Sequence, residues 1–379
     1  MKKIQITLLF LVALCFLSNV LNAQKNQVLH NQNRVITQQF SVNPKDLLEI
    51  DTRNVKVVVE EWGKKEISFI TTLTLHKSTK EDMENLMKAL KLTNKQSGKS
   101  VSYYLRIDWS GDKKTNNLHG LTEITLEIKA PKDIYYKIMA QHGDVEMESI
   151  HNNFNATIAY GNLNVENIFG NKNNIEIKYG NLTMEDLHGN NNLIAIKYGK
   201  FNIYKADHLN LDVKYAQGKI QKTGVLKIDS KYCNLVFDSG ASLIVSSGYD
   251  KISFQNSIDN IKGDMKYGTF LIGSLKYTFN VDLSYSKLKI DEVLPSFSNI
   301  SILSRHSDIL LNIPKEQSFN IDYSGKYTQF KDEKEKWNYT AFEAGSNSLQ
   351  MSGFYGTNPN SKKNVSIQAV YGSVSLFGK

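Results

Sequence analysis

Histidine, cysteine and carboxylate side chains are the residues of this 379-residue chain that could carry out catalysis or hold a metal. The eight histidines are scattered, and the sequence contains no His-Glu-x-x-His, Cys-x-x-Cys, Gly-x-Ser-x-Gly or phosphate-loop pattern. His188 and His208 fall in expected turns, where solvated histidines are much commoner than ligands. The sequence therefore predicts neither an enzyme nor a bound cofactor or metal.

Cys233 is the one cysteine that would remain after removal of an N-terminal signal, because the other is Cys15. It follows Tyr232 where several repeats carry glycine, so we expect a small packed side chain. A nucleophilic thiol would need a nearby cation to lower its pKa, and Lys231 is the only visible candidate. A single cysteine also excludes an intramolecular disulfide.

Two sets of charged residues recur at fixed places and could bind a ligand. A lysine precedes the tyrosine in five repeats: Lys178, Lys197, Lys214, Lys231 and Lys266. Glu148, Glu166 and Glu185 form an acidic set five residues after the glycine. One interpretation is a solvated face whose lysines pair with neighbouring acids. The other is an anion-binding stripe for an acidic glycan, a lipopolysaccharide phosphate or a partner protein.

The charged residues occupy fixed places in a repeat that is marked by regularly spaced tyrosines. These tyrosines are Tyr160, Tyr179, Tyr198, Tyr215, Tyr232, Tyr249, Tyr267 and Tyr285, and successive ones are 17–19 residues apart. A fixed short period is typical of a solenoid. Past Ile290 the repeat loosens, with His306 in the tyrosine place, and the motif returns around Tyr371.

The repeat over residues 174–185 shows how one unit is built. Apolar and polar residues alternate up to Gly180, where the parity shifts by one, and alternate again beyond it. This pattern predicts strand, kink, strand and polar turn. The chain is therefore expected to be all-β, a single-stranded parallel β-helix or β-solenoid of 17–19-residue coils. A β-sandwich is the alternative that short strands also allow.

The direction of the tyrosines decides what they can do. Alternation with Ile177 predicts that they point inward, as structural residues whose stacking contributes about 0.5–1.5 kcal/mol per pair. If the glycine kink turned them outward, a row of tyrosines beside lysine and asparagine would make a platform for sugars.

The regions around the repeats have their own signatures. Residues 78–92 predict one amphipathic helix, capped by Ser78 with Glu81 and carrying an apolar stripe from Met83 to Leu90. Residues 1–23 predict a secretory signal, too short to stay as a membrane span. The expected organisation is a signal peptide (1–23), a flexible segment (24–45), a β-rich N-terminal cap (46–140), solenoid repeats (141–313) and an irregular C-terminal cap with the last coil (314–379).

Three stretches carry a resemblance to a known family: IDTRNVKV at 50–57, ITLEIKAPKD at 124–133, and units such as HGDVEM at 142–147. Together they resemble the bacterial secreted adhesin-like family with a domain of unknown function made of β-strand repeats. The resemblance covers roughly residues 46–290 and the last fifteen residues. It implies a cell-envelope β-solenoid and brings no catalytic residues with it.

These observations predict a non-enzymatic protein exported to the periplasm or cell surface. We expect an adhesin or interaction scaffold for a glycan, an envelope polysaccharide or a surface protein, with no membrane span after signal cleavage. Nucleic acid is not expected as a partner despite the net charge of +8, because no basic–aromatic module is present.

Two other functions stay open. A polysaccharide-active β-helix enzyme, a lyase or hydrolase, would need clustered acids. The candidates do not recur at one repeat position in the sequence: Asp207, Asp212, Asp229, Asp238 and Asp250. The third function is a structural or regulatory role in the periplasm.

Overall fold

The computed structural model describes residues 29–110, 113–331 and 336–377, so the expected signal peptide lies outside the described residues. The chain divides into two compact units. Among the described residues, the smaller contains 29–35, 72–90, 107–110 and 113–124, and the larger contains the others. No helix in the described part of the chain is long and apolar enough to cross a membrane.

The smaller unit contains the helices α2 (Lys80–Ala89) and α3 (Lys113–Asn117) and the 3-10 helix η1 (His119–Leu121). Thr79 caps α2, because its hydroxyl accepts a hydrogen bond from the Asp82 N–H at 3.1 Å and the Asp82 carboxylate accepts one from the Thr79 N–H. The expected cap, Ser78, is buried, and its hydroxyl donates to the Leu75 carbonyl instead. The N-cap therefore lies one residue later than the sequence predicts.

The other elements of the described chain are strands. The first group is β1 (His30–Ser41), β2 (Leu47–Arg53), β3 (Lys56–Trp62), β4 (Glu66–Ser78), β5 (Leu90–Ser97), β6 (Ser100–Ile107), β7 (Thr122–Pro131), β8 (Tyr135–Gln141) and β9 (Val145–Ile150). The second is β10 (Phe154–Ala159), β11 (Leu163–Ile168), β12 (Lys172–Lys178), β13 (Asn181–Leu187), β14 (Asn191–Lys197), β15 (Lys200–Lys214), β16 (Gln217–Lys231) and β17 (Asn234–Gly248). The third is β18 (Lys251–Lys266), β19 (Thr269–Ser284), β20 (Lys287–Val293), β21 (Asn299–Leu311), β22 (Phe319–Lys331), β23 (Trp337–Ala344), β24 (Ser348–Tyr355) and β25 (Asn364–Ser375).

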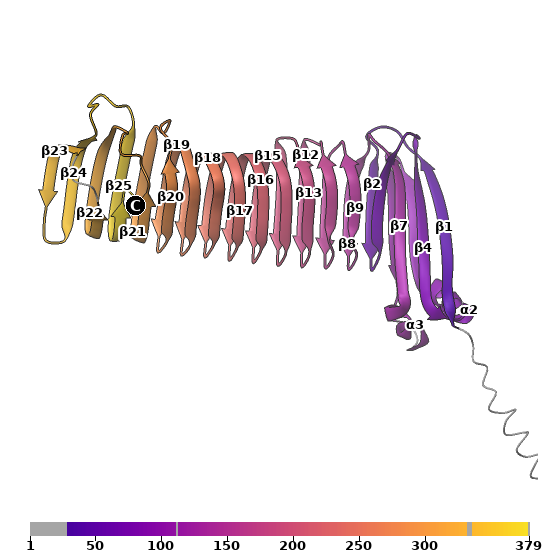
Figure 1. Ribbon diagram of the computed structural model, residues 1–379. Coiled ribbons are helices and arrows are strands. Elements are labelled where there is room, and N and C mark those ends of the chain that lie inside the picture. Colours follow the sequence, from indigo (N-terminus) through magenta and orange to yellow (C-terminus); the bar gives the residue numbers. More distant parts are fainter. Residues whose placement is uncertain (1–28, 111–112, 332–335, 378–379) are drawn as a thin grey trace, which may run out of the picture. The chain divides into compact units, whose positions relative to one another are not determined.

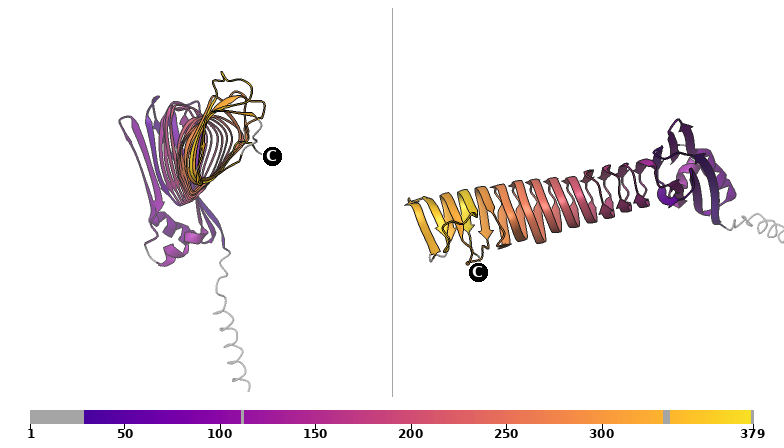
Figure 2. Two further views of the ribbon diagram at one scale, coloured as in Figure 1. Left: turned by 90° about the vertical axis from the view of Figure 1, so that its left-hand side faces the viewer. Right: turned by 90° about the horizontal axis from the view of Figure 1, so that it is seen from above.

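Strands of the repeat region, from β8 to β21, pair in parallel, each with the equivalent strand of the next coil (Figure 1). Ile175 lies opposite Ile194 on one sheet, and Leu182 lies opposite Phe201 on the other. The same register continues coil after coil, and Figure 2 shows the nested windings end-on. The predicted all-β parallel solenoid is confirmed, and the β-sandwich alternative is wrong.

The core is a narrow apolar column between the two sheets. Ile158, Ile177 and Phe237 are each 0% exposed, and the residues opposite them in the adjacent coils are also apolar. Burying each such side chain contributes roughly 1.5–3 kcal/mol. Because successive coils also satisfy each other's backbone groups, a single coil would have neither its core nor its hydrogen bonds.

The order of coils in space departs from chain order at the C-terminal end. β25 pairs in parallel with both β21 and β22, so it lies between them. β22 then pairs with β24 and β24 with β23, both antiparallel. The closing segment, which comes last in the sequence, is thus an inner coil, and β23 is at the edge of the sheet.

Candidate functional site

The repeat tyrosines lie at a sharp corner of the coil and point outward. The eight from Tyr160 to Tyr285 are 42–52% exposed and have φ between +51° and +61°. The prediction that they point inward is therefore wrong. A left-handed residue interrupts the in–out alternation of a strand, so Tyr179 turns to solvent and buried Gly180 takes the inward place after Ile177.

Backbone contacts hold each corner to the next. The Tyr179 N–H donates to the Lys197 carbonyl at 3.0 Å, and the Tyr198 N–H donates to the Lys214 carbonyl at 3.1 Å. A Cβ on Gly180 would lie 1.8 Å from the Gly161 carbonyl oxygen. In the early coils, glycine is required for this close backbone approach.

The exposed rings stack into one continuous column, here called the aromatic ladder. Its ring centroids are 4.6–5.1 Å apart, with interplanar angles of 2–19°. The order along the stack is His142, Tyr160, Tyr179, Tyr198, Tyr215, Tyr232, Tyr249, Tyr267, Tyr285, His306, Tyr371 and Tyr327. The expected tyrosine place of His306 is confirmed.

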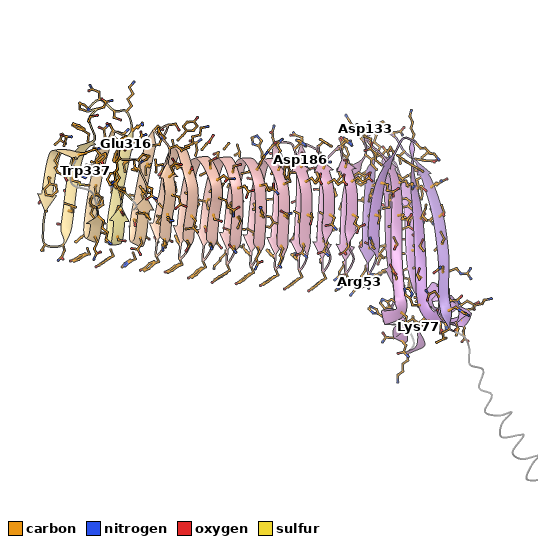
Figure 3. The ribbon with its side chains drawn as sticks, in the orientation of Figure 1. Arg53, Lys77, Asp133, Asp186, Glu316 and Trp337 are labelled. Atoms are coloured by element: carbon orange, nitrogen blue, oxygen red, sulfur yellow. The ribbon has the colours of Figure 1, made fainter. Side chains whose placement is uncertain are left out.

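Stacking determines which part of each ring a partner can touch. Neighbouring ring faces cover one another, so along the ladder the edges and hydroxyls face solvent. Figure 3 shows the row of side chains projecting from this edge of the larger unit, on the side of the labelled Arg53. A platform on which sugars stack face to face would need free ring faces, and the interior of the ladder has none.

The predicted lysine stripe forms one column beside the ladder. Lys178, Lys197, Lys214 and Lys231 lie opposite one another in consecutive coils. Gly248 separates them from Lys266, and the column continues through Ser284 to Arg305. The structure thus brings the five predicted lysines together and adds an arginine.

A second column of cations borders the other side of the ladder, two residues after each tyrosine. Lys200, Lys251 and Lys287 occupy it, with uncharged residues between them. These lysines are not among the site residues predicted from the sequence, although their fixed place two residues after the tyrosine was a usable signal. We call the ladder with its two flanking columns, from Tyr179 to Tyr285, the ridge. Neither column contains a carboxylate within the ridge.

Few of the flanking cations are neutralised. Lys178 pairs with Glu176 at 2.8 Å, and this hydrogen bond raises the pKa of Lys178. Lys214 lies 3.9 Å from Asp212. The Lys231 ammonium lies over the Tyr232 ring, 5.2 Å from its centroid. The other flanking lysines make no ion pair with any described residue.

Acidic residues do recur at one repeat position, contrary to the sequence-based expectation. Asp212 lies opposite Asp229, and Asp264 lies opposite Asp282. These aspartates form a second solvent-facing column, two residues before the lysine column on the same strands and farther from the ladder. A groove of about 660 Å³ on this face is lined by Ser246, Asp264, Lys266, Asp282, Leu283, Ser284, Leu303, Ser304, Arg305, Gln368 and Val370. Asp207, Asp238 and Asp250 lie at other positions of the coil.

The opposite corner of the coil contains a shorter aromatic stack of His151, Phe169 and His188, with centroids 5.0 Å apart. His188 contacts Asp207 at 3.1 Å. Burial raises the pKa of Asp207, but the His188 hydrogen bond and the Lys205 charge outweigh it and leave that pKa lowered. The acidic set predicted from the sequence lines a groove of about 380 Å³ near this corner: Glu148, Glu166 and Glu185, together with Glu60.

The residue after the tyrosine is a buried polar group in some later coils. Asp250 is 3% exposed and accepts hydrogen bonds from the Ser230 and Ser247 hydroxyls and the Cys233 and Gly248 N–H groups. Cys233 is also buried, which raises the pKa of its thiol, and it serves as a packed residue. Within the described residues, no group of three or more His, Cys, Asp or Glu is placed to hold a metal.

No protein-family model and no curated protein matches the chain, so the family resemblance stays a prediction. Among solved structures, it is similar to a candidate cell-adhesion protein from Clostridium sporogenes (11% identity, 91% of this chain, 98% of that chain, TM-score 0.18). It is also similar to a candidate adhesin from Parabacteroides merdae (11%, 71%, 96%, TM-score 0.31) and a candidate lipid-binding protein from Parabacteroides distasonis (13%, 71%, 93%, TM-score 0.25).

Proposed function

We propose that the protein is a non-enzymatic, adhesin-like interaction scaffold, exported to the periplasm or cell surface, and that the ridge is its contact surface. Its partner would be a component of the envelope or of another cell's surface: a glycan, an envelope polysaccharide or a surface protein. The observation that carries this proposal is the exposed aromatic ladder flanked by lysines on both sides.

The energetics of the corner support a role beyond stability. A left-handed backbone costs a non-glycine residue roughly 1–2 kcal/mol, whereas asparagine adopts it more readily. Stacking returns about 0.5–1.5 kcal/mol per ring pair. The two terms nearly cancel, so folding alone does not favour tyrosine over asparagine. Asn54, with φ of +56°, shows that asparagine fits an equivalent corner.

The exposure of the ladder tyrosines also supports a binding role. Ladder tyrosines are about half exposed, and they form one unbroken strip along consecutive coils. Contiguous apolar surface of more than a few hundred Å² is uncommon on a monomer and marks interaction sites. Lysines beside the rings add attraction for partners of negative charge.

A binding comparison between two variants tests the proposal. The ladder variant, Tyr198→Asn, Tyr215→Asn and Tyr232→Asn, removes three consecutive rings and keeps residues suited to the left-handed corner. Labelled mature protein would be applied to glycan arrays, envelope polysaccharides and intact cells. We expect wild-type retention and loss in the ladder variant, with Tyr204→Asn as the control because Tyr204 is 45% exposed outside the ladder. Equal retention of all three proteins would refute the proposal.

One observation favours a second candidate, a polysaccharide-active enzyme. Asp264 and Asp282 are neighbours in register within a groove, beside Lys266 and Arg305. Paired carboxylates on one face are what glycoside cleavage requires. Incubation with acidic polysaccharides would show new unsaturated or reducing ends, lost in Asp282→Asn, if this candidate were correct. The non-enzymatic proposal expects no new ends.

A further inference from the structure

The faces of the ladder rings are unavailable, and this limits the chemistry of the ridge. Each interior ring has a neighbour on both sides at about 4.9 Å, as with Tyr215 between Tyr198 and Tyr232. A partner can therefore meet only the ring edges and hydroxyls. An apolar body with a polar tip, presented edge-on, is the form in which tyrosine occupies the interface of a lipid bilayer.

The ridge is convex and charged on both sides. Its rings project from a corner of the coil, with Lys214 and Lys231 on one side and Lys200 and Lys251 on the other. Grooves beside the ridge include some of its flanking residues, among them Lys266 and Lys200, but no ladder tyrosine lines either groove. A flexible chain buried in such a groove would leave the ring edges uncovered. A flat anionic surface, by contrast, can contact the ring edges and both rows of ammonium groups together.

The position of the acidic residues favours a flat partner over one that extends around the corner onto the face of the sheet. Asp212, Asp229, Asp264 and Asp282 form the next outward column, behind the lysines. An acidic polymer following the face of the sheet would meet these carboxylates and be repelled. A plane touching the tip of the ridge meets the lysines and stays clear of that column.

We infer that the ridge is a docking surface for an anionic lipid bilayer, on which the coils of the larger unit lie with their tyrosine edges at the headgroup level. This inference rests on the proposed function in taking the ridge as the contact surface, and it names a lipid membrane as the envelope component that is bound, in place of a glycan, a polysaccharide or a surface protein. The ridge spans about 30 Å from Tyr179 to Tyr285, given a coil spacing near 4.8 Å, so several headgroups would be engaged together.

Vesicle flotation of the full mature chain tests the inference. The probes are phosphatidylcholine vesicles and vesicles that also contain phosphatidylglycerol. The flank variant, Lys197→Gln, Lys214→Gln and Lys231→Gln, removes three ridge cations. The matched control is Lys219→Gln, Lys222→Gln and Lys227→Gln. It also removes three cations from this stretch of the solenoid, but all three lie on β16 outside the ridge. Far-UV circular dichroism and melting temperatures establish that each variant is folded, and single Tyr215→Asn and Lys214→Gln variants replace any triple variant that is not.

We expect flotation with anionic vesicles only, weakened about tenfold or more in the flank and ladder variants and by added salt. The control variant should stay within about twofold of wild type, since its lysines do not approach the bilayer. Absence of flotation, flotation with neutral vesicles alone or equal loss in the control variant would overturn the inference.

A parallel arm with soluble alginate separates this inference from the proposed function. Ridge-dependent retention of alginate without vesicle binding would leave the scaffold proposal standing and make the partner an acidic polymer. Vesicle and alginate binding that both ignore the ridge variants would contradict the inference and the proposed function together.

Discussion

The two corners of the coil follow different rules. At the tyrosine corner, the left-handed backbone and the stacked ring persist from Tyr160 to Tyr285. The chain on the other side of the coil absorbs the changes in repeat length, with register shifts between Phe237 and Ser239 and between Phe254 and Ser257. The comparison indicates that the tyrosine corner sets the register of the solenoid, and the opposite side accommodates insertions.

The largest difference in stability is expected between a one-residue insertion at the tyrosine corner and the same insertion on the opposite side of the coil. An alanine inserted after Asp238 mimics the natural extra residue near Gln255, and we expect it to cost only about 1 kcal/mol. An alanine inserted after Tyr232 would reverse the facing of the next strand, and we expect a loss of about 4 kcal/mol or more or local unfolding. Thermal unfolding and hydrogen exchange would measure both. Equal effects would contradict the assignment of register to the tyrosine corner.

Removing the carboxylate behind the tyrosine corner should have the next largest effect. Asp250→Ala leaves the hydroxyls of Ser230 and Ser247 and two backbone N–H groups without their buried acceptor. We expect a loss of about 3 kcal/mol. Asp250→Asn should lose less, because one amide oxygen remains. A melting temperature unchanged in Asp250→Ala would show that this network does not stabilise the corner.

Replacing a single ring separates backbone strain from stacking. Tyr215→Ala loses two stacking contacts and keeps the strained backbone, so we expect it to cost about 1–2 kcal/mol. Tyr215→Asn loses the same contacts but relieves strain, and it should be within about 1 kcal/mol of wild type. Chemical denaturation measures the difference. A costlier asparagine than alanine variant would refute the energetic argument for a binding role.

The smallest effect is expected at the opposite corner. The pKa of Asp207 is lowered in the folded state, so its contribution to stability is present above its ordinary pKa of 3.8 and is lost as the pH falls through the folded value. Asp207→Asn should therefore destabilise the protein at pH 7 by less than about 1 kcal/mol, because the pair is partly exposed. Stability measured against pH should show this gap closing in acid. A gap that widened in acid would contradict the assigned direction.

The sequence was sufficient to predict the coil and its register but not the direction of the rings. Tyrosine spacing identifies the stacked positions, yet strand alternation carried through Tyr179 places its ring in the core. The signal for a left-handed corner was available in Asn54, His142 and His306, since these residue types favour positive φ and occupy equivalent places.

The aspartate column and the place of β25 could not be predicted from the local sequence pattern, because both depend on how the coils are ordered in space. Asp229 and Asp264 share one column although 35 positions separate them in the sequence, because Ser246 occupies the coil between them. The insertion of β25 between β21 and β22 has no local sequence signal, since its Tyr371 motif fits any place in the stack.

Acetylation of tyrosine hydroxyls, located by mass spectrometry with and without anionic vesicles, tests most directly the claim that the aromatic ladder is an exposed contact surface. In the free protein we predict that ladder tyrosines react like the exposed Tyr204 and Tyr277, while the buried Tyr103 and Tyr323 do not. With vesicles, the ladder should become protected, and Tyr204 and Tyr277 should stay reactive. Ladder tyrosines as unreactive as Tyr103 in the free protein, or protection shared equally by Tyr204 and Tyr277, would contradict the account.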